Sequence, residues 1–227
     1  MTGQPARSRI INVRPLSKAA FAPFGHVIEN PSGQTDEDIS STIPASANQG
    51  TALVYSNISP VTTKYSESSN NASSGVVMSL FSCSPRQVKS ATDLENLSHS
   101  ETVTGFLDLS VLERHPYTTQ TFIPLGLDRD SSSVAYLVVV APTILGPSKE
   151  AGLPDFSSVQ AFLGRGSQAV TYGVGTWHAP MIVIGDSHIN FVVVQYKNHI
   201  PQDDCEELEF VSSDESGIQI AMPHINK

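Results

Sequence analysis

The sequence predicts a mainly β protein of the sandwich or barrel type, with only a few short helices. Short apolar segments of strand length alternate with turns rich in glycine, proline and asparagine, which is typical of all-β folds. Segments with helical spacing are rare and brief. Charged residues make up only 15 % of the 227 residues, below the roughly 25 % of ordinary domains. Together these observations favour many strands joined by many turns.

The N-terminal part begins with two short strands and a helix between them. We expect strands over residues 10–14 and 26–29, because both are short apolar segments bounded by turn residues. Ser17 is a suitable N-cap for a helix over residues 18–21, and Pro23 would end that helix.

Three polar segments are expected to be surface insertions. Residues 31–47 and 59–75 are rich in Ser, Thr, Gly and Pro and offer little to bury, and residues 142–154 form a loop. The regions on both sides of each segment are needed to complete one core. Because barrels of roughly 200–250 residues commonly form one domain, we expect a single domain over residues 1–227.

Further strands are expected over residues 76–83, 105–112 and 121–125, with a turn of helix over residues 94–99. Residues 135–141 are apolar at every position, which predicts a central strand buried on both faces.

The C-terminal half is expected to begin with a helix over residues 156–163, capped by Asp155, because its apolar residues recur at helical spacing. Strands are then expected over residues 169–174, 181–184 and 189–196.

The net charge of −9 argues against a nucleic-acid or anionic-membrane surface, since either needs clustered Lys and Arg. A small anionic substrate remains compatible, because a few local cations can set the potential inside a pocket. The longest apolar runs, residues 134–141 and 189–194, are too short to span a bilayer. With no apolar leader and no CxxC pair, Cys83 and Cys205 are expected to be free thiols of a cytoplasmic protein.

Three polar clusters stand where expected strands end: residues 113–124, 173–180 and 195–198. Pockets of small barrels open at such ends. Glu113 and His115 are two residues apart, so they share one face of a strand. Gln120 and His178 could join them from other strands.

Two uses of this cluster remain open. One is a site for a divalent metal such as Ni, Mn or Zn, with His115, Gln120 and His178 as ligands. The other is metal-free acid–base chemistry carried by the two histidines. Charged residues at such positions can also be solvated, and Trp177 could wall a pocket or simply fill the core.

These clusters resemble the ureidoglycolate lyase family. The resemblance is carried by ERHPYTTQTFIP within residues 112–125 and by YGVGTWHAP within residues 161–184, and more weakly by residues 11–29 and 189–206. It implies a cupin-like β-barrel of the jelly-roll type and a homodimer. It also implies a carbon–nitrogen lyase of the amidine-lyase type, which cleaves ureidoglycolate to glyoxylate and urea in allantoin breakdown.

The implied reaction needs a base for the hydroxyl proton, an acid for the departing urea and a cation or amide donors for the carboxylate. We expect His115 and His178 to be the acid–base pair and Glu113 to fix a histidine tautomer. Arg114 or Lys197 would hold the carboxylate. The remaining expected substrate contacts are Gln120, Phe122, Tyr172, Trp177 and Tyr196.

Two other classes of function fit the same fold. Glu113 and Gln120 stand where metal-dependent cupins carry two of their usual ligands, so a metal-dependent isomerase or dioxygenase is one alternative. A non-catalytic cupin-like module that binds a small molecule is the other. A hydrolase that releases ammonia instead of urea also remains open.

Overall fold

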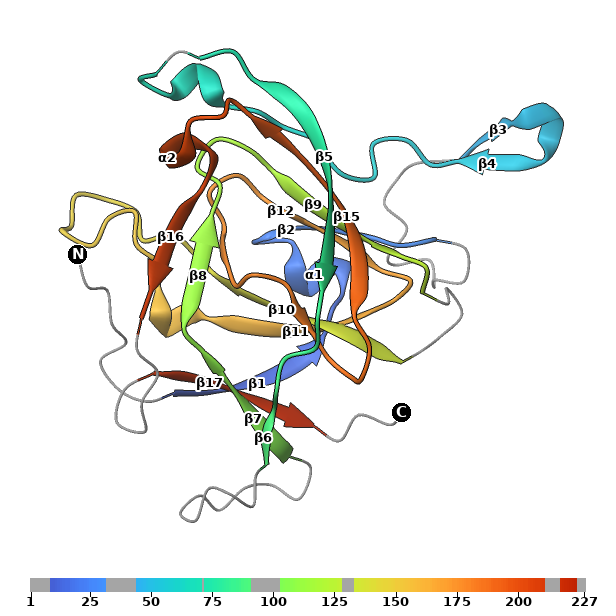
Figure 1. Ribbon diagram of the computed structural model, residues 1–227. Coiled ribbons are helices and arrows are strands. Elements are labelled where there is room, and N and C mark those ends of the chain that lie inside the picture. The colour runs from blue at the N-terminus through green and yellow to red at the C-terminus, as the bar shows by residue number, and fades with distance from the viewer. Residues whose placement is uncertain are drawn as a thin grey trace.

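The computed structural model of the protein describes residues 9–31, 44–70, 72–90, 103–127, 133–210 and 217–223. Its strands form a curled ten-stranded sheet, a five-stranded sheet and a separate two-stranded hairpin (Figure 1). Every helix within these ranges is one turn long. The mainly β, cupin-like prediction is therefore confirmed. None of the helices in the described ranges is long and apolar enough to cross a membrane.

The ten-stranded sheet combines strands from both ends of the chain. Its order is β16 (Glu206–Glu209), β8 (Val111–Arg114), β13 (Trp177–His178), β10 (Val134–Ala141), β11 (Gln160–Arg165), β1 (Arg9–Pro15), β17 (Ile218–Pro223), β7 (Val103–Leu109) and β6 (Lys89–Ser90), with β14 (Ile182–Val183) also paired to β10. Strand β1 runs parallel to both of its neighbours, whereas the other pairs are antiparallel.

The five-stranded sheet is antiparallel throughout. Its order is β2 (Gly25–Ile28), β12 (Ala169–Tyr172), β9 (Gln120–Leu125), β15 (Ile189–Lys197) and β5 (Gly75–Cys83). The hairpin of β3 (Ala45–Ala47) and β4 (Ala52–Val54) projects from the body (Figure 1). The short helices are α1 (Lys18–Phe21), η1 (Asn48–Gly50), η2 (Tyr65–Glu67), η4 (Phe156–Ser158) and α2 (Pro201–Asp204).

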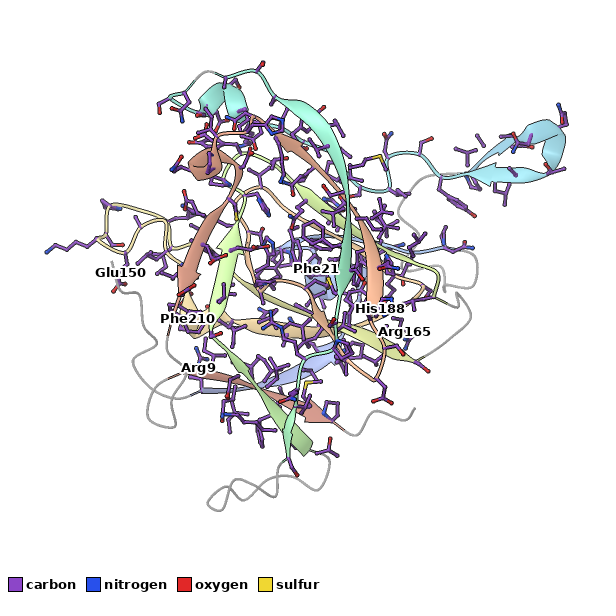
Figure 2. The ribbon with its side chains drawn as sticks, viewed as in Figure 1. Arg9, Phe21, Glu150, Arg165, His188 and Phe210 are labelled. Carbon is purple, nitrogen blue, oxygen red and sulfur yellow. The ribbon has the colours of Figure 1, made fainter. Side chains whose placement is uncertain are left out.

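Two apolar cores lie on the two sides of β10. The barrel core lies between the two large sheets and includes Phe21, Phe122, Tyr136, Val138, Val140, Phe162, Tyr172, Phe191 and Val193. The second core lies on the other side and includes Leu112, Leu137, Val139, Ala141, Trp177, Ile218, Ile220 and Phe210. Phe21 and Phe210 mark the two cores in Figure 2. Because β10 contributes alternate residues to both, the prediction of a strand buried on both faces is confirmed.

Most expected elements are present. Ser17 caps α1, its hydroxyl accepting a hydrogen bond from the amide of Ala20 at 3.3 Å. The strands expected over residues 76–83, 121–125 and 189–196 correspond to β5, β9 and β15. The turn of helix expected over residues 94–99 lies outside the described residues.

The helix expected over residues 156–163 is wrong. Asp155 does cap a turn, η4, by accepting from the amide of Ser157 at 2.9 Å, but the chain then becomes strand β11, paired with both β10 and β1. Phe162 packs in the barrel core, whereas Ala161 packs in the second core. A strand buried on both faces has neighbouring apolar residues, and a short run of them cannot be distinguished from a helix by spacing.

The C-terminal strands β16 and β17 were not expected, yet β17 lies between β1 and β7 in the larger sheet. The segment expected as a polar insertion over residues 59–75 contains the buried Tyr65 and Ser68. Tyr65 reaches the C-terminal part of the chain, where its hydroxyl donates to the Asp204 carboxylate at 2.6 Å. This segment therefore packs on the barrel end next to α2.

Candidate active site

A buried polar cluster lies where β8, β9, β12, β13 and β15 meet at the barrel end. Strands β8 and β13 are antiparallel and place His178 opposite Glu113. The Glu113 carboxylate lies 3.3 Å from Nε2 of His178, and the rings of His115 and His178 are 5.4 Å apart between centroids. We call Glu113, His115, Gln120, Tyr172, His178 and Gln195 the histidine cluster. The structure thus brings together four residues that the sequence predicted would converge.

His115 is held in one tautomer and has a free nitrogen. Its Nδ1 lies 2.6 Å from the backbone carbonyl of Asp204, and a carbonyl can only accept, so Nδ1 carries the proton. Its Nε2 is buried and has no hydrogen-bond partner among the described residues. Burial, together with the charge of His178, lowers the pKa of His115 to about 4. His115 is therefore neutral near pH 7, with an available lone pair inside the cluster.

His178 has the opposite surroundings, because both of its ring nitrogens face oxygen atoms. Nδ1 lies 2.9 Å from the carbonyl of Thr176. Nε2 lies 3.2 Å from the side-chain oxygen of Gln120 and 3.3 Å from the Glu113 carboxylate. Each ring nitrogen of His178 therefore has an oxygen acceptor within hydrogen-bonding distance, so the ring can donate from either side. Tyr172 stacks on the ring with centroids 3.9 Å apart and fixes its plane.

Glu113 is the negative charge of the cluster. Burial alone would raise its pKa, but the hydrogen bond and charge of His178, with smaller effects from His115 and Lys197, lower it overall. Glu113 is therefore ionised near neutral pH. Cys205 lies beside it, with Sγ 4.0 Å from the carboxylate, and burial followed by the charge of Glu113 raises the pKa of this thiol to about 12. Cys83 and Cys205 are both free, as expected, and Cys205 is not a thiolate here.

An amide pair supports the cluster from the five-stranded sheet. Gln120 and Gln195 face each other on β9 and β15, and Nε2 of Gln120 donates to Oε1 of Gln195 at 2.7 Å. That bond orients the Gln120 oxygen toward His178. Because side chains alternate along a strand, Lys197 shares the inward face of β15 with Gln195. Its charge contributes to the lowered pKa of Glu113.

Arg114 and Trp177 lie on the other side of the same wall. Each is the sequence neighbour of a cluster residue, so strand alternation directs it away, and Trp177 belongs to the second core. The guanidinium of Arg114 lies over the Trp177 ring, 5.0 Å from its centroid, and pairs with Glu206 at 2.6 Å. The expectation that Arg114 and Trp177 contact the substrate is not supported by these positions.

Tyr196 is also not brought to the cluster. It follows Gln195 on β15, so its side chain points out of the barrel, while its backbone amide and carbonyl bond Thr118 and Tyr65. Gln195 faces the cluster in place of the expected Tyr196, and strand alternation from Lys197 is the signal in the sequence that identifies it. Asp204 was missed because its carbonyl acts through the backbone, for which a sequence gives no signal.

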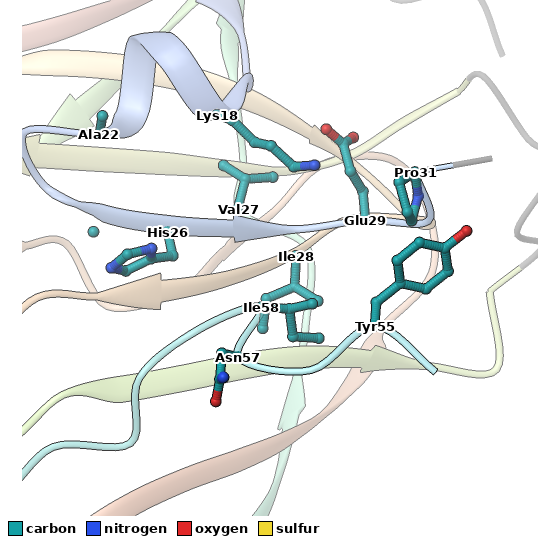
Figure 3. A pocket seen from close by; sticks show the side chains of 11 residues that line it. Lys18, Ala22, His26, Val27, Ile28, Glu29, Pro31, Tyr55, Asn57 and Ile58 are labelled. Carbon is teal, nitrogen blue, oxygen red and sulfur yellow. The ribbon is translucent and has the colours of Figure 1, made fainter. Parts of the chain in front are cut away.

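The cluster is closed in this structure. His115 and His178 are only 5 % and 1 % exposed, and Phe122 lies beneath Tyr172 with ring centroids 6.0 Å apart. A cavity of about 340 Å³ lies elsewhere, on the outer side of β2, and is lined by residues such as His26, Glu29 and Tyr55 (Figure 3). It contains no residue of the histidine cluster, and neither does a larger cavity of about 690 Å³ that is lined by residues such as Ala135, Ile184 and His188.

A family model described as ureidoglycolate lyase matches residues 8–216. The chain belongs to the ureidoglycolate lyase family. Among its relatives are proteins named ureidoglycolate lyase from Schizosaccharomyces pombe and Saccharomyces cerevisiae, each 39 % identical over 210 residues. These matches cover 92 % of this chain and 94 % of the first relative, and 88 % and 93 % for the second. A bacterial relative of the same name, from Burkholderia mallei, is 31 % identical over 186 residues and covers 82 % of both chains.

In this ureidoglycolate lyase family member, segment 62–70 and α2 pack together beside the cluster. The amide of Lys64 donates to the carbonyl of Tyr117 at 2.6 Å. Ser68 donates to the Asp203 carboxylate at 2.6 Å, and Tyr65 donates to Asp204 as described above. Asp204 therefore orients His115 through its backbone carbonyl and holds segment 62–70 through its carboxylate.

The cluster contains a set of groups suited to a divalent metal. Ligand atoms of Glu113, His115 and His178 all lie within 4.8 Å of one another. Two imidazoles and one carboxylate are a common donor set for catalytic zinc and for non-haem iron. The unpartnered Nε2 of His115 fits such a role, because a buried nitrogen without a partner is costly. The ligands expected from the sequence were His115, Gln120 and His178. In the structure the third group beside the two histidines is Glu113, whereas Gln120 lies within hydrogen-bonding distance of His178.

Proposed function

We propose that this protein cleaves ureidoglycolate to glyoxylate and urea by acid–base elimination. The observation that carries the proposal is the contrast between two adjacent imidazoles. Nε2 of His115 is buried without a hydrogen-bond partner among the described residues, whereas both ring nitrogens of His178 face oxygen atoms to which they can donate. An elimination needs such a base and such an acid at one place. Membership of the ureidoglycolate lyase family supports the choice of substrate.

His115 acts as the base. Its Nε2 takes the proton of the substrate hydroxyl, and the electrons of that bond form the carbonyl of glyoxylate while the carbon–nitrogen bond breaks. The carbonyl of Asp204 holds the Nδ1 proton in place. The Glu113 carboxylate stabilises the positive charge that develops on the ring.

His178 acts as the acid. Its Nε2 proton passes to the departing urea nitrogen, so the products leave as neutral urea and glyoxylate. A proton returned from His115 to His178 restores the starting state. Glu113 and Gln120 face His178, and Glu113 also influences the pKa of His115, so both side chains can assist this return.

Lys197 holds the substrate carboxylate, because it shares the inward face of β15 with Gln195 and its charge acts on Glu113. Gln120 and Gln195 orient the urea amide, and Tyr172 fixes the plane of His178. Phe122 closes the apolar floor. Substrate entry requires a movement at this barrel end, because the two histidines are buried; segment 62–70, which is held there by Asp203 and Asp204, is the part that we propose moves.

The trio of Glu113, His115 and His178 would hold a divalent metal such as Ni, Mn or Zn. When bound, the metal supplies Lewis acidity that polarises a substrate oxygen. The same trio favours a second candidate function, a metal-dependent cupin isomerase or dioxygenase. Metal content of the purified protein and activity after chelation separate the two. Stoichiometric iron without glyoxylate release would favour the second.

The direct test is an assay of the purified chain with ureidoglycolate, in which glyoxylate, urea and ammonia are measured together. We expect one urea for each glyoxylate and no ammonia above background. Ammonia in place of urea would indicate the hydrolase reaction. Absence of glyoxylate release, with substrate binding retained, would overturn the proposal in favour of a binding module.

We further propose that the protein works in allantoin catabolism in the cytoplasm, as a homodimer and as a single domain over residues 1–227 with insertions at 31–47, 59–75 and 142–154. The two free thiols suit a reducing compartment. Cell fractionation would test the location, and loss of growth on allantoin as nitrogen source in a deletion strain would test the pathway.

A further inference from the structure

Asp204, the last residue of α2, lies between the proposed base and segment 62–70. Its backbone carbonyl accepts the Nδ1 proton of His115 at 2.6 Å, and its carboxylate accepts from the hydroxyl of the buried Tyr65 at 2.6 Å. Helix α2 lies at the same barrel end as the start of β5, which follows this segment in the chain (Figure 1). One residue therefore contacts the base through its main chain and the neighbouring segment through its side chain.

The same carboxylate also holds the turn that follows β15. Its Oδ1 accepts from the amide of Asn198 at 2.9 Å, and its Oδ2 accepts from the amide of His199 at 3.1 Å. His199 has a φ of 63°, in the left-handed region that residues other than glycine adopt only at a cost. Such a backbone persists where its surroundings hold it, and here one carboxylate binds two consecutive amides.

This turn begins directly after Lys197, the proposed partner of the substrate carboxylate. Helix α2 returns to the turn through its main chain, because the amides of Asp203 and Asp204 both donate to the carbonyl of Ile200 at 2.9 Å. Hydrogen bonds of the turn and of α2 thus connect the carboxylate of Asp204 to its own carbonyl. A change at the carboxylate is therefore expected to shift the turn and the carbonyl together.

Asp203 offers a comparison with its neighbour. Its buried carboxylate accepts from the hydroxyl of Ser68 at 2.6 Å and from the side-chain amide of Asn198 at 2.7 Å. It therefore also holds segment 62–70 against α2. The carbonyl that orients the proposed base belongs to Asp204. The two adjacent carboxylates thus share the holding of the segment and differ in their connection to the base.

We propose that Asp204 is a positioning residue of the lyase reaction: binding of segment 62–70 to its carboxylate fixes the carbonyl that keeps the proton on Nδ1 of His115. This role rests on the proposed function, because it takes His115 as the base. With Nδ1 protonated, Nε2 presents its lone pair to the substrate hydroxyl.

Movement of segment 62–70 changes the support of the carbonyl. The carboxylate of Asp204 has three donors in the closed structure: one hydroxyl from the segment and two amides from the turn. When the segment moves away to admit substrate, the hydroxyl of Tyr65 is lost and the carbonyl is held less firmly. The base is therefore oriented for reaction in the closed state, in which both histidines are buried.

The first test compares Asp204→Asn with Asp203→Asn, which are the same substitution at neighbouring positions. Asparagine has an amide group in place of one carboxylate oxygen, so Asp204→Asn cannot accept from donors on both sides. We expect it to lower kcat at least about tenfold more than Asp203→Asn does, with KM changed by less than about threefold, because a displaced base costs turnover more than binding. Rates of glyoxylate release measure both constants. Equal losses of kcat would overturn the proposal.

Nitrogen-15 NMR of the histidine side chains, with chelator present, measures the tautomer without requiring turnover. The signals of His115 are identified by their absence in His115→Gln. We expect a protonated Nδ1 in the wild type and in Asp203→Asn, and a mixture of tautomers in Asp204→Asn. An unchanged tautomer in Asp204→Asn would overturn the positioning role even if kcat falls. A wild type with the expected tautomers but no glyoxylate release would overturn the proposed reaction instead, so the two failures are distinguished.

Circular dichroism checks that the variants fold. If Asp204→Asn does not fold, the pair Tyr65→Phe and Ser68→Ala replaces it. Each of these removes one hydroxyl that donates at 2.6 Å from segment 62–70 to one of the two adjacent carboxylates. Tyr65→Phe should increase the population of the second His115 tautomer, whereas Ser68→Ala should not. Identical tautomer populations in the two variants would overturn the proposal.

Discussion

The two faces of the wall formed by β8 and β13 carry residues that are adjacent in sequence but different in environment. On the barrel side, Glu113 and His178 form a buried pair next to an imidazole with a free nitrogen. On the other side, Arg114 pairs with Glu206 and covers the ring of Trp177, whose Nε1 donates to the carbonyl of Gly152 at 3.0 Å.

The difference between the two faces separates chemistry from structure. On the outer side, each of the polar groups named above has a hydrogen-bond or ion-pair partner, as is typical of contacts with a purely structural role. On the barrel side a buried nitrogen is left without a partner, and such an atom calls for a ligand or a reaction to explain it.

The largest effect is expected for His178→Ala. Removing the proposed acid should lower kcat by roughly 100-fold or more, while the fold persists because Tyr172 and the barrel core remain. Glyoxylate release and thermal unfolding measure the two effects. The control is Trp177→Phe on the opposite face, which should keep kcat within about threefold of the wild type. Near-normal turnover of His178→Ala would exclude it as the acid.

A smaller loss is expected for Glu113→Gln, which keeps the shape of the side chain but removes its charge. Without the carboxylate, the proposed acid His178 loses the group that lies 3.3 Å from its Nε2, and kcat should fall by roughly 10- to 100-fold. Glu206→Gln removes the corresponding carboxylate on the other face and should change kcat by less than about threefold. Equal losses of kcat in the two variants would show that the Glu113 carboxylate contributes no more to catalysis than the Glu206 carboxylate on the other face.

The buried His115 predicts a pH dependence of stability. Its folded pKa of about 4 lies below the ordinary value of 6.5, so the unfolded chain binds more protons between these values and stability falls as pH falls through this window. Between pH 7 and pH 5 this group alone should reduce the free energy of unfolding by about 2 kcal/mol. Urea unfolding with chelator present, at both pH values, measures the change.

The variant His115→Gln is the control for this pH effect, and it should lose less stability over the same range. The lowered pKa of Glu113 affects stability in a different pH range. Its contribution to the free energy of unfolding is fully present above the unfolded pKa of a carboxyl group and is lost only as the pH falls below that value. Identical pH dependence in wild type and variant would contradict the neutral, buried state of His115.

The smallest effect is expected for Arg114→Met. The pair with Glu206 and the contact with Trp177 are partly exposed, so their loss should reduce the free energy of unfolding by about 1 kcal/mol. The value of kcat/KM should change by less than about twofold, since the guanidinium lies away from the cluster. A rise in KM of about tenfold or more would show that Arg114 does hold the substrate carboxylate.

Local pattern predicted much of the fold, and each failure has a physical cause in the tertiary structure. Strand β10 was identified as central because every residue in it is apolar, and it separates the two cores. Strand β11 was taken for a helix because burial on both faces removes the alternation that identifies a strand. Strand β17 was missed, since only its pairing with β1 and β7 makes that short segment part of a sheet.

As with the fold, local spacing predicted part of the site. The two-residue spacing of Glu113 and His115 predicted that they share one side of the chain, and both lie near His178 although β8 ends at Arg114. The same rule, applied to β15, selects Gln195 with Lys197 in place of Tyr196. The carbonyl of Asp204 leaves no trace in the sequence, because every residue has one.

By itself the sequence determined the β class, the family and the group of polar residues from which the site is drawn, because these depend on residue type and local spacing. Tertiary structure alone decided which set of alternate residues in each strand faces the barrel. For this reason His178 is a cluster residue and Trp177 is not. It also decided the protonation states, because the tautomer of His115 depends on a carbonyl 89 positions away in the chain. Alternation fixes only which residues share a face, whereas the choice of inner face depends on how distant strands pair.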